Sequence, residues 1–427
     1  MELKRVVVTG LGAITPLGND VETTWNNAVA GVSGAGPITH FNAELFKTQF
    51  ACEVKDFDMK MCMINPDDRA EMKDIKRMDL YSQYALASAK QAIADSDLMA
   101  EGIDRDNVGV IFASGIGGLH TFEIEAGNYA KHEEDGPRYS PFFIPTMIAD
   151  IAAGHISMKY GLRGPNFGVV SACATSTNAM IDAFNYVRLG KAKAIVTGGS
   201  EAPIFPAGVG GFNTMRALST RNDEPTTASR PFSASRDGFV IGEGAVCLIF
   251  EELEHALARG AKIYGEVIGG GMSADAYHIT ATHPEGLGAK LVMQRALDDA
   301  GIKPEEVDYV NVHGTSTPVG DPSEAKAIAA VFGDQAYKMN ISSTKSMTGH
   351  MLGATGAMEA LFCLLACQTG IIPPTINHAE GDEDETIDYK MNFTFNKAQK
   401  RDVNIALSNT FGFGGHNASI IVKKYKG

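Results

Sequence analysis

The sequence predicts an α/β fold built from two similar halves. Short β-branched runs such as RVVVTG, NVGVIFASG and KAIVTGGSEA alternate with longer stretches of helical periodicity. After residue 260 the alternation starts again with KIYGEVIGGG, VDYVNVHG and VNIALSNT. The two halves also end alike, because GFVIGEGAVCLIF and GFGGHNASIIV both place glycines at a turn before an apolar strand. We therefore expect a duplicated architecture, with residues 1–260 as the first half and 261–427 as the second.

Length and composition exclude several classes of protein. The chain has 427 residues, of which 44% are hydrophobic, and this supports a core larger than that of a single small domain. The formal net charge of -14 supplies no general basic face, so nucleic-acid binding is not expected. The six cysteines show neither a CxxC pair nor the density of a disulfide scaffold, which favours a reducing, cytoplasmic location.

No targeting or membrane segment is expected. The opening MELKRVVVTG enters a strand-like run by Val6, which leaves no room for a signal peptide. The longest uncharged apolar stretch follows Glu359 and is interrupted by Pro373 and Pro374 before it could cross a bilayer. Residues 61–80, which contain the charge-dense PDDRAEMKDIKRMD, interrupt the α/β alternation and predict an exposed loop or cap.

Cys173 is the strongest candidate for a nucleophile. The strand-like NFGVVSA leads directly into a helical pattern in which Met180, Ala183, Phe184 and Val187 share one face. Cys173 should therefore lie at a helix N-terminus, where free amides and the helix dipole can lower a thiol pKa from ~8.5 to ~3.5–7.5. The alternative is a small buried residue that packs where strand meets helix, but the small neighbouring residues leave space for a substrate.

Two histidines stand at equivalent places in the second half. His313 ends the run VDYVNVHG, and His350 follows NISSTKSMTG at the start of a glycine-containing helix. Loops at the carboxyl edge of a sheet are where α/β enzymes gather reactive groups. Either histidine alone could be structural, but together with Cys173 they predict a Cys-His-His catalytic set. The cysteines and histidines show no zinc-type spacing, and the glycine clusters lack a P-loop lysine, so neither a metal nor a nucleotide is expected.

Several sequence blocks resemble a known family. SACATS, VHGTSTPVGD, STKSMTGHMLGATG and NTFGFGGHN are similar to signature blocks of the β-ketoacyl-acyl carrier protein synthases, and the similarity extends through SPFFIP, YGLRGPN and RALSTRND. Within the family the chain most resembles the elongating synthase II of bacterial dissociated fatty acid synthesis. The resemblance implies a thiolase-like fold with a five-layered αβαβα body, usually as a homodimer.

The reaction that the resemblance implies is decarboxylative Claisen condensation. An acyl chain bound to Cys173 would react with malonyl-acyl carrier protein to give 3-oxoacyl-acyl carrier protein, CO2 and free carrier protein. The implied roles are hydrogen bonding to the enolate by His313 and His350, ordering of the histidine loop by Lys345, and an oxyanion hole made by the amides of Cys173 and Phe411. No cofactor is implied, because the phosphopantetheine arm of acyl carrier protein carries the substrates.

The resemblance also implies further contact residues. Thr315 and Thr317 would bind the phosphopantetheine arm, and Phe411 would act as a gate at the pocket mouth. Ile116, Phe142 and Phe143 would line the pocket near the dimer contact. Glu324 and Glu359 match acidic positions near the site, although single carboxylates on helices are more often solvated or paired.

A basic cluster could dock the acidic carrier protein despite the negative net charge. The cluster consists of Arg69, Lys73, Lys76 and Arg77. Complementary charge patches mainly raise association rates in a salt-sensitive way. Acidic residues lie between the basic ones, so a solvated helix face is an equally good interpretation.

Other members of the same superfamily remain as alternatives. The chain departs from common family patterns at Ala174 and Thr175 in SACATS and at His416 in the terminal loop, but neither change removes a reacting group. The presence of His350 disfavours an initiating synthase III, and the lack of a second cysteine in GFGGHN disfavours a degradative thiolase. A polyketide-type or coenzyme A-dependent condensing enzyme stays open, as does a non-catalytic chain-length partner subunit, although that subunit would be expected to have lost Cys173.

Overall fold

One mixed sheet of ten strands crosses the molecule in the computed structural model, which describes residues 3–427. Its strands are β1 (Val6–Ile14), β4 (Val108–Ala113), β5 (Asn166–Phe167), β6 (Ala194–Glu201), β7 (Gly244–Glu252), β8 (Gly265–Ala274), β9 (Tyr309–Asn311), β10 (Asn340–Ser342), β13 (Ile405–Gly412) and β14 (His416–Lys423). Two small ladders pair β2 (Gly36–Pro37) with β3 (Phe50–Ala51) and β11 (Ile371–Ile372) with β12 (Gln399–Lys400).

The sheet repeats the same topology twice, which confirms the predicted duplication. The strand order is β1-β7-β6-β4-β5 in the first half and β8-β14-β13-β9-β10 in the second. In each half the first two pairs are antiparallel and the last two are parallel. The halves join where Val6 to Val8 of β1 pair with Gly265 to Val267 of β8.

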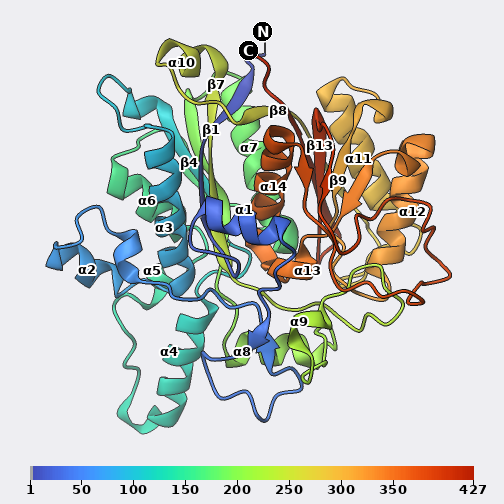
Figure 1. Cartoon of the computed structure of the whole chain (residues 1–427). Coiled ribbons are helices and arrows are strands. Elements are labelled where there is room, and N and C mark those ends of the chain that lie inside the picture. Colours follow the sequence, from blue (N-terminus) through green and yellow to red (C-terminus); the bar gives the residue numbers. More distant parts are fainter. Residues whose placement is uncertain (1–2) are drawn as a thin grey trace.

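Helices cover both faces of the sheet and fill the space between its halves. They are α1 (Val21–Val29), α2 (Arg69–Ile75), α3 (Leu80–Asp95), α4 (Leu119–Lys131), α5 (Phe143–Met147), α6 (Ile151–Tyr160), α7 (Thr175–Arg188), α8 (Pro206–Thr214), α9 (Pro225–Ala228), α10 (Leu253–Ala258), α11 (Leu287–Ala300), α12 (Gly320–Phe332), α13 (Lys345–Thr348) and α14 (Thr355–Thr369). Figure 1 shows α3 and α6 outside the first half, α7 and α14 in the centre, and α11 and α12 outside the second half. This arrangement is the five-layered αβαβα body of the thiolase-like fold.

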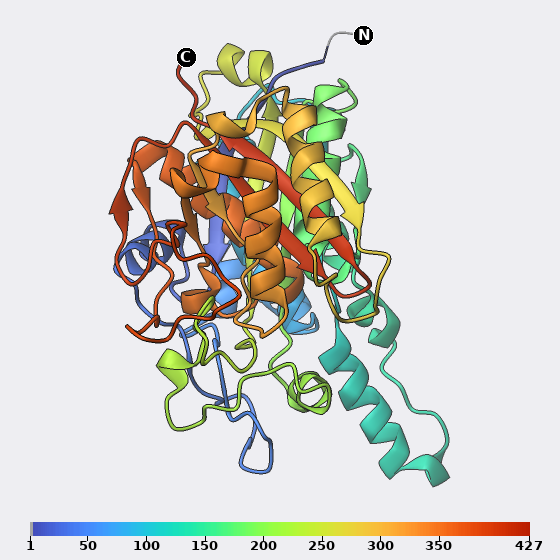
Figure 2. The same ribbon diagram turned by 90° about the vertical axis from the view of Figure 1, so that its right-hand side faces the viewer.

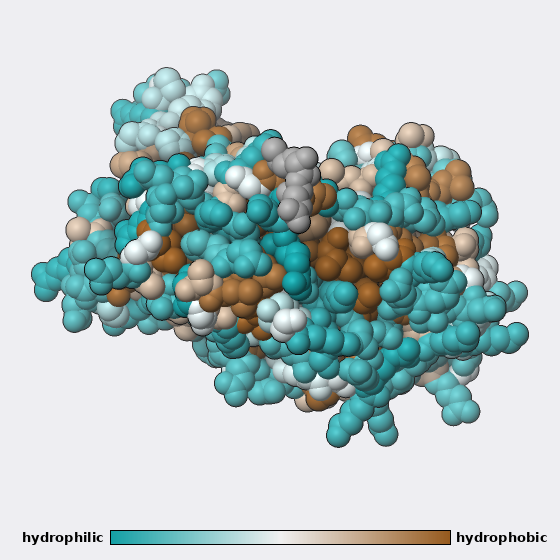
Figure 3. Space-filling model, turned by 90° about the horizontal axis from the view of Figure 1, so that it is seen from above, coloured by the Kyte–Doolittle hydropathy of each residue, from teal (hydrophilic) through white to brown (hydrophobic). Residues whose placement is uncertain are grey.

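The central layer explains the most apolar segment of the chain. Leu352–Thr369 is long and apolar enough to cross a membrane, but 89% of it is buried inside the protein. Cys363 and Cys367, in the apolar run LFCLLAC, both lie in this buried core. Seen from the end that carries both termini, the surface is largely hydrophilic, and hydrophobic atoms appear mainly in a strip across the middle (Figure 3).

Two segments differ locally from the expectations. Residues 61–80 are exposed over most of their length, but they include the helix α2, because the Asp68 side chain accepts hydrogen bonds from the amides of Ala70 and Glu71 and caps its first turn. The predicted strand NFGVVSA pairs only at Asn166 and Phe167. Beyond this short β5 the chain lies at the edge of the sheet and continues as an unpaired segment toward Cys173.

Candidate active site

Cys173 lies in a tight turn at the start of a central helix. The turn Ala172–Ala174 leads directly into α7, as the sequence predicts. Ala172 has a φ of 51°, a left-handed conformation that is uncommon for a residue with a side chain and typical of strained functional turns. The backbone amides of Phe413 and of Cys173 itself lie close enough to the sulfur to lower the pKa of the thiol, although by less than burial raises it.

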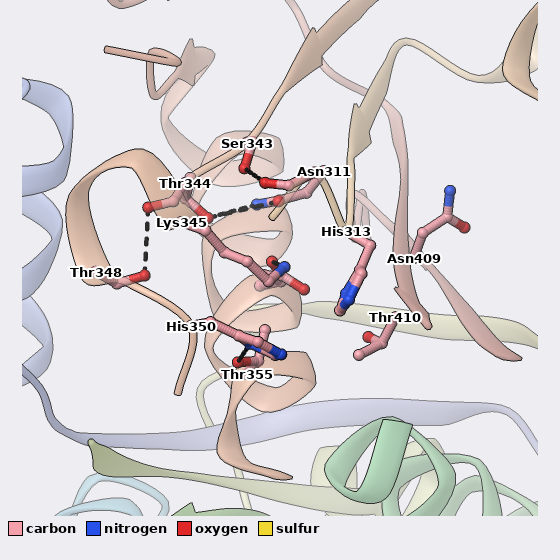
Figure 4. A network of polar contacts seen from close by, with 12 residues as sticks. Asn311, His313, Ser343, Thr344, Lys345, Thr348, His350, Thr355, Asn409 and Thr410 are labelled. Carbon is pink, nitrogen blue, oxygen red and sulfur yellow. Dashed lines mark hydrogen bonds and ion pairs between the residues drawn. The ribbon is translucent and has the colours of Figure 1, made fainter. Parts of the chain in front are cut away.

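The two predicted histidines meet at this sulfur. Nε2 of His350 lies 3.0 Å from Sγ of Cys173, and Nδ1 of His350 lies 3.0 Å from Oγ1 of Thr355. The rings of His313 and His350 are perpendicular, with centroids 5.2 Å apart. Figure 4 shows that the two imidazoles come from separate segments, His313 following β9 and His350 following α13. The structure therefore brings the Cys-His-His set together.

Backbone hydrogen bonds hold both histidine segments in place. The amide of His350 donates to Val240 O at 2.7 Å, and its carbonyl accepts from Gly242 N at 2.9 Å. The amides of His313 and Gly314 donate to the two carboxylate oxygens of the buried Glu324, at 2.9 and 2.8 Å. The two histidine segments are thus held by different parts of the chain: that of His350 by Val240 and Gly242, and that of His313 by Glu324.

Burial changes the electrostatics that the sequence suggests for Cys173. Loss of water raises the pKa of the Cys173 thiol to about 12, and the opposing effects of Lys345 and of the two amides are smaller. The expectation of a lowered thiol pKa is therefore wrong for the free enzyme. The sulfur does lie at a helix N-terminus, but at this buried position the loss of hydration of the thiolate outweighs the stabilising field of the helix.

Both histidines are neutral near pH 7. Burial lowers the pKa of His313 and His350 well below 6.5, and the charge of Lys345 lowers both further. Lys345 is buried, with its Nζ paired to a carboxylate oxygen of Glu359; burial raises the pKa of that carboxyl, and the charge of Lys345 opposes the rise. Lys345 therefore lies inside the protein and not at its surface. Figure 4 shows its side chain extending from the loop into the space beside the two imidazoles.

A cavity of about 780 Å³ opens onto these groups. Eight of the predicted residues line it, namely Cys173, His313, His350, Phe411, Thr315, Thr317, Ile116 and Glu324. Phe142 and Phe143 do not line it, which corrects their assignment as pocket residues within this chain. Phe142 is exposed beneath the guanidinium of Arg77, with 4.8 Å from its ring centroid to Cζ, and Phe143 stacks on the α4 segment through Phe122.

The oxyanion site has two candidate phenylalanine amides. Phe411 points its ring toward His313, with centroids 5.6 Å apart, as a gate would. The amide that reaches the sulfur belongs to Phe413, two residues later. Gly412 lies against the cysteine turn so closely that a Cβ there would be 3.0 Å from the amide nitrogen of Cys173. The Phe413 amide is thus a second candidate donor beside Cys173, and the pair of Cys173 and Phe411 stays a prediction.

The basic cluster lies apart from the cavity. Arg69, Lys73, Lys76 and Arg77 border a separate surface groove of about 510 Å³, which shares no lining residue with the cavity. Arg77 pairs with Asp74 at 3.5 Å, and the groove is solvent-exposed. The structure thus provides an exposed basic helix face without showing what binds there. No arrangement of three or more His, Cys, Asp or Glu side chains suited to a metal occurs within residues 3–427.

Sequence reasoning missed several charged residues of the site, among them the following three. Glu201, at the end of TGGSEA, and Arg216, in RALSTRND, both line the cavity. The buried Arg236, in RDGFV, donates to the carbonyls of Thr317 and Pro318 at 2.9 and 3.0 Å and so holds the threonine loop. For Glu201 and Arg236 a sequence signal was available, because each is a charged residue in a glycine-rich or apolar run.

Comparisons with known proteins agree with this geometry. Residues 3–256 match the family described as Beta-ketoacyl synthase, N-terminal domain, and residues 264–379 match Beta-ketoacyl synthase, C-terminal domain. The chain is 48% identical to 3-oxoacyl-(acyl-carrier-protein) synthase 2 of Staphylococcus aureus over 424 residues, and 48% identical to the protein of that name from Coxiella burnetii over 425 residues, with 99% of each chain covered.

Solved structures give the same result. A beta-ketoacyl synthase from Burkholderia phymatum superimposes with a TM-score of 0.89 at 33% identity, over 99% of this chain and 100% of the other. A ketosynthase structure described as a type II PKS acyl-carrier protein in complex with its ketosynthase bound to the hexaketide superimposes with a TM-score of 0.90 at 31% identity and the same coverage. The chain therefore belongs to the beta-ketoacyl synthase family.

Proposed function

We propose that this protein condenses an acyl chain held on Cys173 with malonyl-acyl carrier protein, in the elongation of fatty acids. The observation that carries the proposal is the convergence of one thiol and two neutral imidazoles on a single cavity, with His350 Nε2 3.0 Å from the sulfur. The 48% identity to synthases named for 3-oxoacyl-acyl carrier protein supports fatty acid elongation over polyketide synthesis.

Acylation begins with a neutral pair. His350 accepts the thiol proton as Cys173 attacks the thioester carbonyl of acyl-acyl carrier protein, and the amides of Cys173 and Phe413 stabilise the oxyanion. When the tetrahedral intermediate collapses, the carbon–sulfur bond to the carrier arm breaks and the arm leaves as a thiol with the proton from His350. The raised pKa of the thiol makes this neighbouring base necessary.

Condensation uses the same imidazoles as donors. Malonyl-acyl carrier protein loses CO2, and the electrons of the broken carbon–carbon bond form an enolate whose oxygen accepts hydrogen bonds from His313 and His350. The hydroxyl of Thr355 can accept from Nδ1 of His350 in one tautomer and donate in the other, so Nε2 can serve as base and later as donor. The carbanion attacks the acyl thioester, and Cys173 leaves as a thiolate that takes one proton from water.

The substrates would reach the cavity on the carrier arm. Thr315 and Thr317, whose hydroxyl oxygens lie 3.1 Å apart on the cavity wall, offer hydrogen bonds to an amide-rich arm. We assign docking of the acidic carrier protein to the basic cluster on α2 and the following turn. The reaction needs no prosthetic group, since the carrier arm supplies the thioester, and we place the protein in the cytoplasm.

A homodimer is part of this proposal. The segment from α4 to α6 exposes large apolar side chains, and Figure 2 shows α4 projecting from the body. These side chains are Phe122, Ile124, Phe142, Ile144, Ile148 and Met158. Val170, which lines the cavity, is also 63% exposed beside the open edge of β5. A second copy that covers this face would complete the cavity wall.

Transfer of a labelled acyl group tests the proposal directly. Incubation with acyl-acyl carrier protein and intact-mass analysis should show one added acyl group, and peptide mapping should place it on Cys173. Addition of malonyl-acyl carrier protein should then release CO2 and the elongated 3-oxoacyl product. Selective acylation from acyl coenzyme A would favour the coenzyme A-dependent alternative, and no acylation of Cys173 from either donor would favour a non-catalytic subunit.

A further inference from the structure

Glu201 is a buried carboxylate that the proposed reaction does not use. It ends β6, has no exposed surface and lines the cavity. Oε1 accepts hydrogen bonds from Ser114 Oγ at 2.8 Å and Ile116 N at 3.1 Å. Oε2 accepts from Gly115 N and Gly353 N, both at 2.9 Å. Four donors therefore converge on one side chain, which is typical of a buried carboxylate that organises its surroundings.

The four donors belong to two walls of the cavity. Gly115 and Ile116 line it from the loop after β4, and Gly353 follows Leu352, which lines it from the segment that begins at His350. The walls meet over Glu201 without room for side chains, because a Cβ on Gly115 would lie 2.8 Å from Oε2 and one on Gly353 would lie 2.5 Å from Gly115 N. The position of the Ile116 wall thus depends on this carboxylate.

We propose that Glu201 is a positioning residue that fixes the Ile116 wall and thereby sets the dependence of Cys173 acylation on acyl length. The inference rests on the proposed function. Gly115 adjoins the cysteine turn, since its Cβ would lie 3.3 Å from Ala172 O, and Ile116 is the next residue in the lining of the same cavity. A short acyl chain stays near Cys173, whereas a long one packs against Ile116 and is affected by any displacement of the wall.

Glu201→Gln should loosen one wall of the cavity and leave the other in place. An amide has one oxygen that accepts and one nitrogen that only donates. The oxygen can keep the amides of Gly115 and Gly353, and the nitrogen then faces Ser114 Oγ, which can rotate to accept, and Ile116 N, which cannot. The variant should release the Ile116 amide while Gly353 and the His350 segment stay in place.

The readout is the ratio of Cys173 acylation rates with tetradecanoyl- and hexanoyl-acyl carrier protein. We expect this long-to-short ratio to fall about tenfold in Glu201→Gln, while decarboxylation of malonyl-acyl carrier protein stays within about twofold of wild type. A ratio within about twofold of wild type, or a ratio that rises, would overturn the proposal. An equal loss of acylation and decarboxylation would also overturn it, because that indicates general damage.

Glu251→Gln is the matched control. The Glu251 carboxylate is equally buried, but it accepts from Thr9, His255 and Arg259 outside the cavity. This variant should lower the melting temperature without changing the long-to-short ratio. If Glu201→Gln does not fold, Ser114→Ala removes one donor to the same carboxylate and should lower the ratio about threefold; an unchanged ratio in a folded Ser114→Ala protein contradicts the proposal. Failure of wild type to be acylated by either chain length would instead refute the proposed function.

Discussion

At the residue scale, Cys173 and His350 are two groups whose pKa values burial moves in opposite directions. The thiol pKa rises and the imidazole pKa falls, so both partners are neutral at rest. Nucleophilicity then depends on the 3.0 Å separation between Sγ and Nε2, across which a proton can move as the substrate is attacked. A neutral resting pair also leaves His350 able to act as an uncharged donor in the second step.

Replacement of His350 tests this double role. His350→Ala removes one of the two enolate donors, and loss of one such donor typically costs ~10²–10³ in rate. We expect release of CO2 from malonyl-acyl carrier protein to fall by that factor and acylation of Cys173 to slow as well. His416→Ala is the control, because His416 is exposed at the start of β14 and does not line the cavity. Undiminished CO2 release by His350→Ala would contradict the assignment.

The neutral histidines also make the stability of the fold depend on pH. The pKa of His313 and His350 is lower in the folded protein than the ordinary value of 6.5, so the unfolded chain binds more protons as the pH falls below 6.5. The contribution of these two histidines to stability should therefore be highest above pH 6.5 and decrease below it, by up to ~1.4 kcal/mol per pH unit for each histidine. Denaturant titrations at pH 7.0 and 5.5 measure this loss. His350→Gln should show a smaller loss, and an equal loss in both proteins would refute the histidines as its cause.

At the scale of elements, the two central helices begin with the same device. The turns Ala172–Ala174 and Leu352–Ala354 each open with a left-handed residue and lead directly into α7 and α14. The helices also cross closely, since a Cβ on Gly356 would lie 1.9 Å from Oγ1 of Thr177. Duplication therefore produced two equivalent turns, of which one carries the nucleophile and the other supplies the Gly353 amide to Glu201.

The sequence predicts helices, strands and site residues only where a local pattern of residues specifies them. Strand and helix periodicity was enough for the α/β class and the repeat, and the motifs were enough for Cys173, His313 and His350. The strand at NFGVVSA was overestimated because β-branched residues report local preference, whereas pairing needs a neighbouring strand that the edge of the sheet lacks. The thiol pKa and the amide of Phe413 depend on residues that burial brings together from distant segments, so no local pattern reports them.

Charge reversal tests whether the basic cluster on α2 and the following turn docks acyl carrier protein. Charge reversal by Lys76→Glu with Arg77→Glu should raise the KM for acyl carrier protein about tenfold at low salt and leave kcat little changed, because the cluster lies outside the cavity. The effect should shrink as salt increases. Lys338→Glu with Lys400→Glu, two exposed positions in the second half, is the control. An unchanged KM in the α2 variant would remove this helix from docking.

At the scale of the whole molecule, the two similar halves present different outer surfaces. The outer side of the second half is covered by α11 and α12, while the first half adds the projecting α4 and the short α5. Phe142 and Phe143 belong to this addition and lie outside the cavity of their own chain. Their apolar character is explained if the face between α4 and β5 is covered by another copy, as the family resemblance implies for Phe142 and Phe143.

Self-association through this face is the final prediction. Ile144 is 55% exposed on α5, in the middle of the apolar segment, so Ile144→Glu would place a charge where a second copy is proposed to pack. Sedimentation velocity should give twice the chain mass for wild type and a concentration-dependent shift toward one chain mass for the variant. Leu257→Glu changes a similarly exposed apolar residue on α10, at the opposite end from α4 in Figure 1, and should leave the mass unchanged.

Because Val170 links this face to the cavity, Ile144→Glu should also slow acylation of Cys173 in proportion to the monomer formed. A wild-type protein that sediments as a single chain at all concentrations would contradict both the dimer and the completion of the cavity wall by a second copy.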